Sequence, residues 1–302
     1  MENLAKSINA TEDFELEIDG FKFAAKSWGD PSGKPVLGLH GWLDNANTFA
    51  RIAPLLNDDV YLVAVDMAGH GYSQHRPANT SYYLWDYALD VLRITEVFRW
   101  KQFSILSHSM GTGIAAILSG CFPDRVLKQV FIDGLGAPFV IEQQQAVSHF
   151  YTAFRQLEMA KKVKLYGFSP DDEAQFPSRE AAIADRMKSF VGSISAKAAS
   201  YLVDRALVSV PEGVRWSHDP RLVLPEFFRI TEQQARSFLA RIKAPTKVIL
   251  GHQGLFNTPL GKGRIASFPE ASVEWIDGNH HLHLEEAHTQ VVQIINNFLK
   301  QY

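Results

Sequence analysis

The stretch ILSHSMG, residues 105–111, is the part of the sequence that decides the fold. An apolar run ends in two serines that bracket a histidine, which predicts a buried strand turning sharply into a helix with a serine at the tip. The residues two before and two after that serine must be small, because the two backbones nearly touch there. With Ser109 at the tip these positions are Ser107 and Gly111, whereas Ser107 at the tip would bring Ile105 into a clash. Ser109 is therefore the candidate nucleophile.

Two backbone N–H groups are expected beside Ser109. The small residues that follow it, in MGTGIAAIL, open a helix whose N-terminus points at the serine, so the N–H of Met110 faces the position where an oxyanion would develop. In LGLHGW, residues 37–42, a strand that ends in His-Gly lets the N–H of Trp42 turn toward the same point. Met110 and Trp42 are the predicted oxyanion hole. We expect His40 to be a core histidine that orients this loop.

A candidate base lies in IDGNHHLHLEEAH, residues 276–288. A histidine that follows the last strand, before the final helix, can reach Ser109, so we predict His280 as the base and keep His281 as a reserve. His283 and His288 are expected nearer the helix and its solvent side. Four histidines within nine residues are also compatible with a metal site. No acidic or cysteine cluster elsewhere has ligand spacing, so we expect neither a metal nor a cofactor.

The order of apolar runs predicts one α/β domain with an insertion. Short β-like and helical segments alternate from Phe14 to about Asp133, and FELEI with FKFAAKSW reads as an opening antiparallel pair. Continuous apolar runs such as VYLVAVD are typical of parallel strands buried on both faces. Long helical periodicity follows, and the alternation returns with TKVILGHQG. We predict a core domain over 1–134 and 243–302, with a mainly helical cap or lid over 135–242.

Composition excludes several other classes of protein. The 302 residues are 46% hydrophobic and carry a formal net charge of −3, with no long run of one sign, so neither nucleic acid nor an anionic membrane is a favoured partner. No window approaches the ~20 apolar residues that span a bilayer. The first residues lack the features of a signal peptide, and the single Cys121 cannot form an internal disulfide. We expect a cytoplasmic protein without a membrane anchor, and a buried Cys121 thiol.

The motifs HGWLDNANTF, VDMAGHGYS, SHSMG and GNHHLHLEE, in this order and spacing, resemble the α/β-hydrolase fold superfamily. HGWLDNA, with WSHDPRL in the insertion, is similar to the branch that contains serine hydrolase-like proteins and their bacterial relatives. The resemblance extends over nearly the whole chain from about residue 12. It implies a mostly parallel α/β-hydrolase sheet flanked by helices, with a helical cap after the sixth strand. It also implies that Asp66, Gly69 and Gly71 form turns beside the site without taking part in the chemistry.

The sequence departs from this family at the acid of the triad. The resemblance implies an aspartate in a G-x-x-D loop after the seventh strand, but here the loop reads GHQGLFN, with Gly254 at the usual position and Asn257 three residues later. Neither carries a charge that stabilises an imidazolium. A known variation takes the acid from the end of the sixth strand, where FIDG offers Asp133. A turn-forming role for Asp133 is the alternative, and we favour the catalytic one.

These residues predict a carboxylesterase-like serine hydrolase. Ser109 would attack an ester carbonyl, His280 would transfer the proton and Asp133 would orient the imidazolium. Aromatic side chains of the insertion suggest a small-molecule ester with an apolar acyl or alcohol part; they are Phe139, Phe150, Phe154, Trp216, Phe227 and Phe228. We expect one or two of them to line the pocket. A serine at 109 argues against the haloalkane dehalogenases and epoxide hydrolases of this fold, which use a carboxylate. Two alternatives stay open, a C–C bond hydrolase acting on diketones and a non-catalytic binding protein, and the oligomeric state is not predicted.

Overall fold

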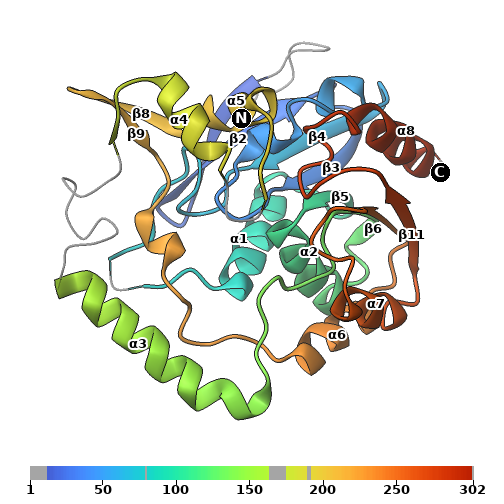
Figure 1. The fold of residues 1–302 in the computed structure, drawn as a ribbon. Coiled ribbons are helices and arrows are strands. Elements are labelled where there is room, and N and C mark those ends of the chain that lie inside the picture. The colour runs from blue at the N-terminus through green and yellow to red at the C-terminus, as the bar shows by residue number, and fades with distance from the viewer. Residues whose placement is uncertain (1–11, 79, 163–174, 189–191, 301–302) are drawn as a thin grey trace.

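A computed structural model of the chain describes residues 12–78, 80–162, 175–188 and 192–300 (Figure 1). Its centre is an eight-stranded sheet in the order β1-β2-β4-β3-β5-β6-β10-β11. Every neighbouring pair from β4 to β11 is parallel, whereas β1 and β2 are antiparallel to their neighbours. The strands are β1 (Glu12–Ile18), β2 (Phe21–Trp28), β3 (Lys34–Leu39), β4 (Val60–Val65), β5 (Phe103–His108), β6 (Val126–Ile132), β10 (Thr246–Gly251) and β11 (Ala271–Ile276). The predicted fold class is confirmed.

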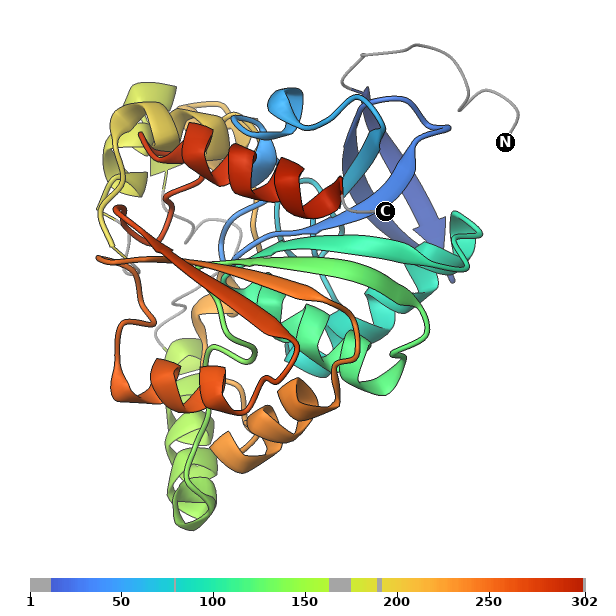
Figure 2. The ribbon, with the colours of Figure 1, turned by 90° about the vertical axis from the view of Figure 1, so that its right-hand side faces the viewer.

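Helices cover both faces of the sheet (Figure 2). One apolar cluster joins the sheet to α1 (Leu84–Val97), α2 (Met110–Cys121), α6 (Glu232–Arg241) and α7 (Pro259–Ala266). A second cluster joins the opposite face to α8 (His288–Leu299) and to the short 3-10 turns η1 (Ala46–Phe49) and η2 (Ala53–Leu55). All six side chains of β4 are buried, as the unbroken apolar run VYLVAV predicts for a strand covered on both sides. The sheet therefore lies between two helical layers.

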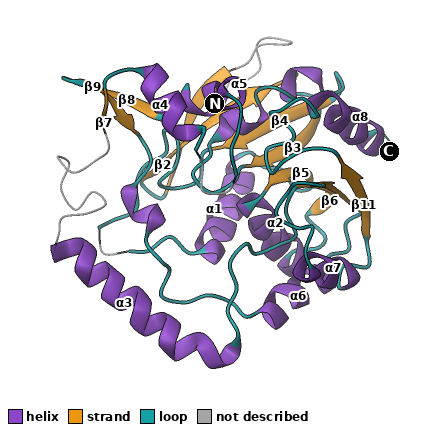
Figure 3. Ribbon diagram, viewed as in Figure 1, coloured by secondary structure: helices purple, strands orange, loops and turns teal. Residues whose placement is uncertain are grey.

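The segment between β6 and β10 is less helical than its sequence suggests (Figure 3). It contains a three-stranded sheet in the order β7-β9-β8, which short runs within an otherwise helical pattern did not reveal. Helix α6 was expected to belong to the insertion, yet it packs on α2 and its Leu239 lies in the main core cluster. The other elements of the segment are η3 (Gln143–Gln145), α3 (Ala146–Lys162), β7 (Gln175–Phe176), α4 (Arg179–Arg186), α5 (Ala196–Val203), β8 (Leu207–Val210), β9 (Gly213–Trp216) and η5 (Pro220–Val223).

Two arginines of this inserted segment are bound to aspartates of the core. Arg205, just after α5, donates from Nε to both carboxylate oxygens of Asp66, at 3.1 and 2.9 Å, and also pairs with Asp13 on β1. Arg186, at the end of α4, donates from Nη2 to Asp44 Oδ1 at 2.6 Å. The Asp44 and Asp66 side chains are buried, so each ion pair is shielded from water. Breaking such a pair leaves an uncompensated buried charge, which is strongly destabilising.

Three expectations about the chain as a whole have different outcomes. Cys121 was expected to be buried and is exposed, because α2 ends there and its last residue points away from the core. Within the described residues, no helix combines the length and apolar character that crossing a membrane requires. The N-terminal residues 1–11, on which most of the signal-peptide expectation rests, lie outside the described part of the chain.

Candidate active site

Ser109 occupies the turn between β5 and α2 in a strained backbone conformation. Its φ is +50° and its ψ −116°, a combination that costs energy for a residue with a side chain and persists only where the surroundings enforce it. Gly111 lies so close to β3 that an added Cβ would overlap the carbonyl oxygen of Leu39. Ser107 is fully buried and donates to the carbonyl of Val130 at 3.1 Å. The requirement for small residues two positions either side of Ser109 thus has a visible steric cause.

His280 bridges Ser109 and Asp133. The three residues come from three separate segments of the chain. His280 Nδ1 lies 2.6 Å from Asp133 Oδ2, and His280 Nε2 lies 2.8 Å from Ser109 Oγ. Because a carboxylate only accepts, Nδ1 carries the hydrogen and Nε2 accepts from the serine hydroxyl. His280 is 3% exposed and Asp133 is fully buried. Hydroxyl, imidazole and carboxylate therefore form one continuous hydrogen-bonded line at the carboxyl edge of the sheet.

The loop after β10 holds the Asp133 carboxylate without contributing an acid of its own. Gly251 N–H donates to Oδ1 at 3.1 Å, and Leu255 N–H donates to Oδ2 at 3.0 Å. A Cβ built on Gly254 would overlap Asp133 Oδ1, so the carboxylate fills the space where a side chain at position 254 would begin. Asn257 points elsewhere and donates to the carbonyl of His252 at 3.3 Å.

The environment of His280 favours the neutral imidazole. Burial lowers the pKa of His280 below its usual value, because the charged form loses its hydration. The hydrogen bond and charge of Asp133 oppose this by stabilising the imidazolium, and the net direction is downward. A neutral ring with a free Nε2 lone pair is the form that accepts a proton from a hydroxyl.

The two predicted oxyanion donors lie next to the Ser109 turn. Met110 is the first residue of α2, so its N–H has no acceptor within the helix. Within the described residues, neither this N–H nor that of Trp42 donates to another group. The loop that carries Trp42 runs against the turn, since an added Cβ on Gly41 would lie 3.2 Å from Ser109 Cβ. Trp42 and Met110 line the same cavity.

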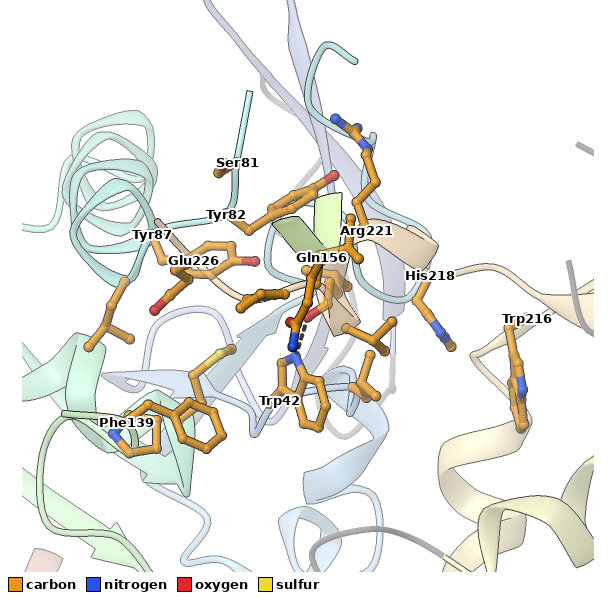
Figure 4. A pocket seen from close by; sticks show the side chains of 18 of the residues that line it. Trp42, Ser81, Tyr82, Tyr87, Phe139, Gln156, Trp216, His218, Arg221 and Glu226 are labelled. Atoms are coloured by element: carbon orange, nitrogen blue, oxygen red, sulfur yellow. Dashed lines mark hydrogen bonds between the residues drawn. The ribbon is translucent and has the colours of Figure 1, made fainter. Parts of the chain in front are cut away.

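That cavity has a volume of about 910 Å³ and lies between the core and the inserted segment (Figure 4). Of the six insertion aromatics named from the sequence, Phe139, Trp216 and Phe227 line it, one more than expected. The Trp42 indole Nε1 donates to the carbonyl of Leu222 at 3.0 Å and so joins the loop beside Ser109 to the inserted segment. Burial raises the pKa of Glu226, another lining residue, to about 7. The lining is mainly aromatic and aliphatic.

Two of the other three histidines in the predicted cluster are buried, whereas His288 is partly exposed at the start of α8, as expected. His283 was expected near the surface and is fully buried, packed against His108 with ring centroids 4.4 Å apart. His281 is also buried, and burial lowers its pKa to about 4. His281 faces Asp44 and, among the described residues, has no hydrogen bond to Ser109, whereas His288 begins α8. The loop that follows β11 thus buries His281 and His283, which the spacing of the histidines in the sequence did not indicate.

A metal-like arrangement exists behind His280. Within the described residues, Asp44, His108 and His281 offer donor atoms that all lie within 4.8 Å of one another. Arg186 already neutralises Asp44, and the side chains of Asp44, His108 and His281 are 1% exposed. A divalent ion would add two uncompensated positive charges to this dry interior, which is costly. We therefore interpret the group as a polar network.

The sequence interpretation assigned no role to Asp44 or His108, although both stood in the motifs it used. A buried polar residue at the end of a strand needs a hydrogen-bond partner, and this rule could have identified His108 as part of a polar network. His40 fits its expected role, because it is fully buried and its Nε2 accepts from Met67 N–H at 2.9 Å.

Comparisons with known proteins agree on the kind of chain this is. A family described as alpha/beta hydrolase fold matches residues 34–287. A serine hydrolase-like protein of Dictyostelium discoideum is 33% identical over 94% of this chain and 80% of its own length. One of Danio rerio is 32% identical over 96% of this chain and 89% of its own length. The crystal structure of a hypothetical protein from Pseudomonas aeruginosa PAO1 superposes with a TM-score of 0.88 at 37% identity, covering 96% of this chain and all of that one.

Proposed function

Because this chain belongs to the α/β-hydrolase fold family, we propose that it is a serine hydrolase that cleaves carboxylic esters through an acyl-enzyme. Ser109 attacks the ester carbonyl while His280 Nε2 takes its proton and returns it to the leaving alcohol. Asp133 holds the imidazole in the required tautomer and stabilises the imidazolium. The N–H groups of Trp42 and Met110 bind the oxyanion. Water then attacks the acyl-enzyme by the same sequence of proton transfers.

One observation carries this proposal, the unbroken line from Ser109 Oγ through His280 to Asp133. The two contacts, 2.8 and 2.6 Å, lie within the range of strong hydrogen bonds. A structural role for Ser109 alone would not require a base within reach, nor the strained backbone at the tip of the turn. The unoccupied N–H groups beside it add the second component that acyl transfer needs.

The cavity supports a substrate with an apolar part. A volume of about 910 Å³ lies in the upper range of small-molecule sites and accommodates an acyl or alcohol chain of considerable length. We assign the inserted segment the role of a cap over Ser109, ending before α6, which packs on α2 as part of the core. A cap that supplies Phe139, Trp216 and Phe227 to the lining sets acyl preference without altering the chemistry.

Active-site titration with a fluorophosphonate tests the proposal. The folded protein is expected to become labelled in a one-to-one ratio, and Ser109→Ala is expected to abolish labelling while keeping the same thermal unfolding midpoint. Ser107→Ala is the matched control and should keep its labelling, because the Ser107 hydroxyl is buried and donates to the carbonyl of Val130. Labelling that survives Ser109→Ala, or an unlabelled wild-type protein, contradicts the proposal.

A substrate panel then separates the ester reaction from its two competitors. p-Nitrophenyl esters of increasing acyl length should be hydrolysed, with the length preference reporting the cavity. Turnover of a diketone, with none of the esters, would instead favour C–C bond hydrolysis by the same three residues. A tight ligand without acylation would favour a binding protein.

A further inference from the structure

A second polar network lies beside His280 and consists of His108, Asp44 and Arg186. Its central residue is His108, which precedes Ser109 in the chain and is 1% exposed. His108 Nε2 lies 3.0 Å from the carbonyl oxygen of His280. A carbonyl only accepts, so Nε2–H donates to it. The residue before the nucleophile thus contacts the main chain of the base.

Asp44 and Arg186 support the other side of the His108 ring. His108 Nδ1 lies 3.2 Å from Asp44 Oδ2 in an ion-pair geometry that is not well aligned as a hydrogen bond. Asp44 Oδ1 accepts from Arg186 Nη2 at 2.6 Å, and Thr48 Oγ1 donates to Asp44 Oδ2 at 3.3 Å. The ring therefore makes its hydrogen bond to the His280 carbonyl, while its other nitrogen lies beside the Asp44 carboxylate without a hydrogen bond.

The neighbouring histidines do not share this contact. His281 Nε2 lies 3.3 and 3.4 Å from the Asp44 carboxylate oxygens, and its Nδ1 has no partner among the described residues. His283 Nε2 lies 2.9 Å from Thr48 Oγ1, and its Nδ1 likewise lacks a described partner. In the part of the chain that the structure describes, His108 is the one side chain bonded to the His280 carbonyl.

Support of the His280 main chain matters because His280 lies in a loop. The segment between β11 and α8 has neither strand ladder nor helix to hold it, and its Gly278 has φ +157°. The imidazole must stay within hydrogen-bond reach of both Ser109 and Asp133. A misplacement of ~1 Å at a catalytic group can reduce the rate ~10²-fold.

We propose that His108 is a positioning residue for the catalytic base: it fixes the main chain of His280 through the Nε2–H bond to its carbonyl. The proposal rests on the proposed function, because it takes His280 to be the base.

Two substitutions at His108 separate positioning from packing. The carboxamide of His108→Gln reaches the place of Nε2 and donates to the His280 carbonyl, whereas that of His108→Asn reaches only the place of Nδ1. His283→Asn is the matched control, because His283 is an equally buried ring that packs on His108 and, among the described residues, has no hydrogen bond to His280. Each variant is compared after normalising to titrated active sites.

The first readout is the second-order rate constant of fluorophosphonate acylation. His108→Asn is expected to lower it ~10- to 100-fold, and His108→Gln to restore most of this loss. His283→Asn should lower the unfolding midpoint as much as His108→Asn does, but leave the rate constant within ~3-fold of the wild type.

The second readout is the low-field proton NMR signal of the His280 Nδ1–H that is bonded to Asp133, which needs no substrate. We expect it in the wild type, in His108→Gln and in His283→Asn, and expect exchange to broaden it in His108→Asn. A protein that is never acylated but shows this NMR pattern contradicts the proposed function and upholds the positioning role. A His108→Asn variant that keeps the signal and matches His283→Asn in rate overturns the positioning role.

Discussion

The sheet edge that carries Ser109, His280 and Asp133 is held differently from the inserted segment that we propose as its cover. At the edge, His280 and Asp133 are buried, and hydrogen bonds join Ser109 to His280, His280 to Asp133, and Leu255 N–H to Asp133. On the inserted segment, α3 extends away from the sheet and exposes 83% of Val147 and 63% of Tyr151 (Figure 1). The inner side of the cover is nevertheless well anchored, because Arg205 pairs with Asp66, Tyr82 donates to Asp219, and Trp42 donates to the carbonyl of Leu222. The exposed outer face of α3 is therefore the part of the cover whose side chains can change at the smallest cost.

The sharpest test of the core side of this comparison is Asp133→Asn. An amide at this position leaves the packing almost intact but cannot stabilise the imidazolium and favours the wrong tautomer, so kcat for a p-nitrophenyl ester should fall ~10⁴-fold. Steady-state kinetics with titrated enzyme measures this, with Asn257→Ala as a control that should stay close to wild type, because Asn257 contacts only a carbonyl of its own loop. Wild-type turnover in Asp133→Asn would show that the acid is another residue.

A smaller but more specific effect is expected from Gly254→Ala. The added methyl group overlaps Asp133 Oδ1 and must displace the carboxylate from His280, which should lower kcat/KM ~10²-fold. In an Asp133→Ala background the carboxylate is absent, so adding Gly254→Ala should lower kcat/KM by less than a further ~3-fold. This strong coupling is expected for two groups in direct contact. Additive losses of kcat/KM in the double variant would contradict the steric explanation.

The smallest effect is expected on the exposed face of α3. Replacing Val147 and Tyr151 together by serine should change the free energy of unfolding by less than ~0.5 kcal/mol, because both side chains are largely in water already. Turnover of short esters should be unchanged. Phe139→Ala is the contrasting variant, since Phe139 lines the cavity and should alter the preferred acyl length. Urea unfolding measures the change in stability, and a series of esters of different acyl length measures the change in preference. A large loss of stability in the serine double variant would mean that α3 packs more tightly than described.

The sequence predicted the core better than the cover, for physical reasons. Strands such as VYLVAV are buried on both faces, and their unbroken apolar runs identify them without any knowledge of their neighbours. Ser109 was found because the small residues around it are a local steric requirement. Asp133 was proposed from the family resemblance, which implies that the acid can lie at the end of the sixth strand, and its Oδ2 lies 2.6 Å from His280 Nδ1.

Other features depend on contacts between distant segments and left no local pattern. Arg186 reaches Asp44 across 142 positions of the chain, and His108 meets the His280 carbonyl only because the loop after β11 passes beneath the strand end. The three-stranded sheet of the insertion consists of strands of two to four residues, too short to show a period of two. Cys121 was expected to be buried because cysteines usually are, but it is exposed.

The mutual exclusion between the Asp133 carboxylate and any side chain at 254 also has a historical consequence. One tolerated substitution cannot convert an ancestor with its acid in the loop after β10 into a descendant with its acid at the end of β6. An intermediate with both acids would be crowded around Asp133, and an intermediate with neither would lack an acid. Glycine at one position and aspartate at the other should therefore be inherited as a pair. We therefore expect these two positions to vary together among relatives of this chain.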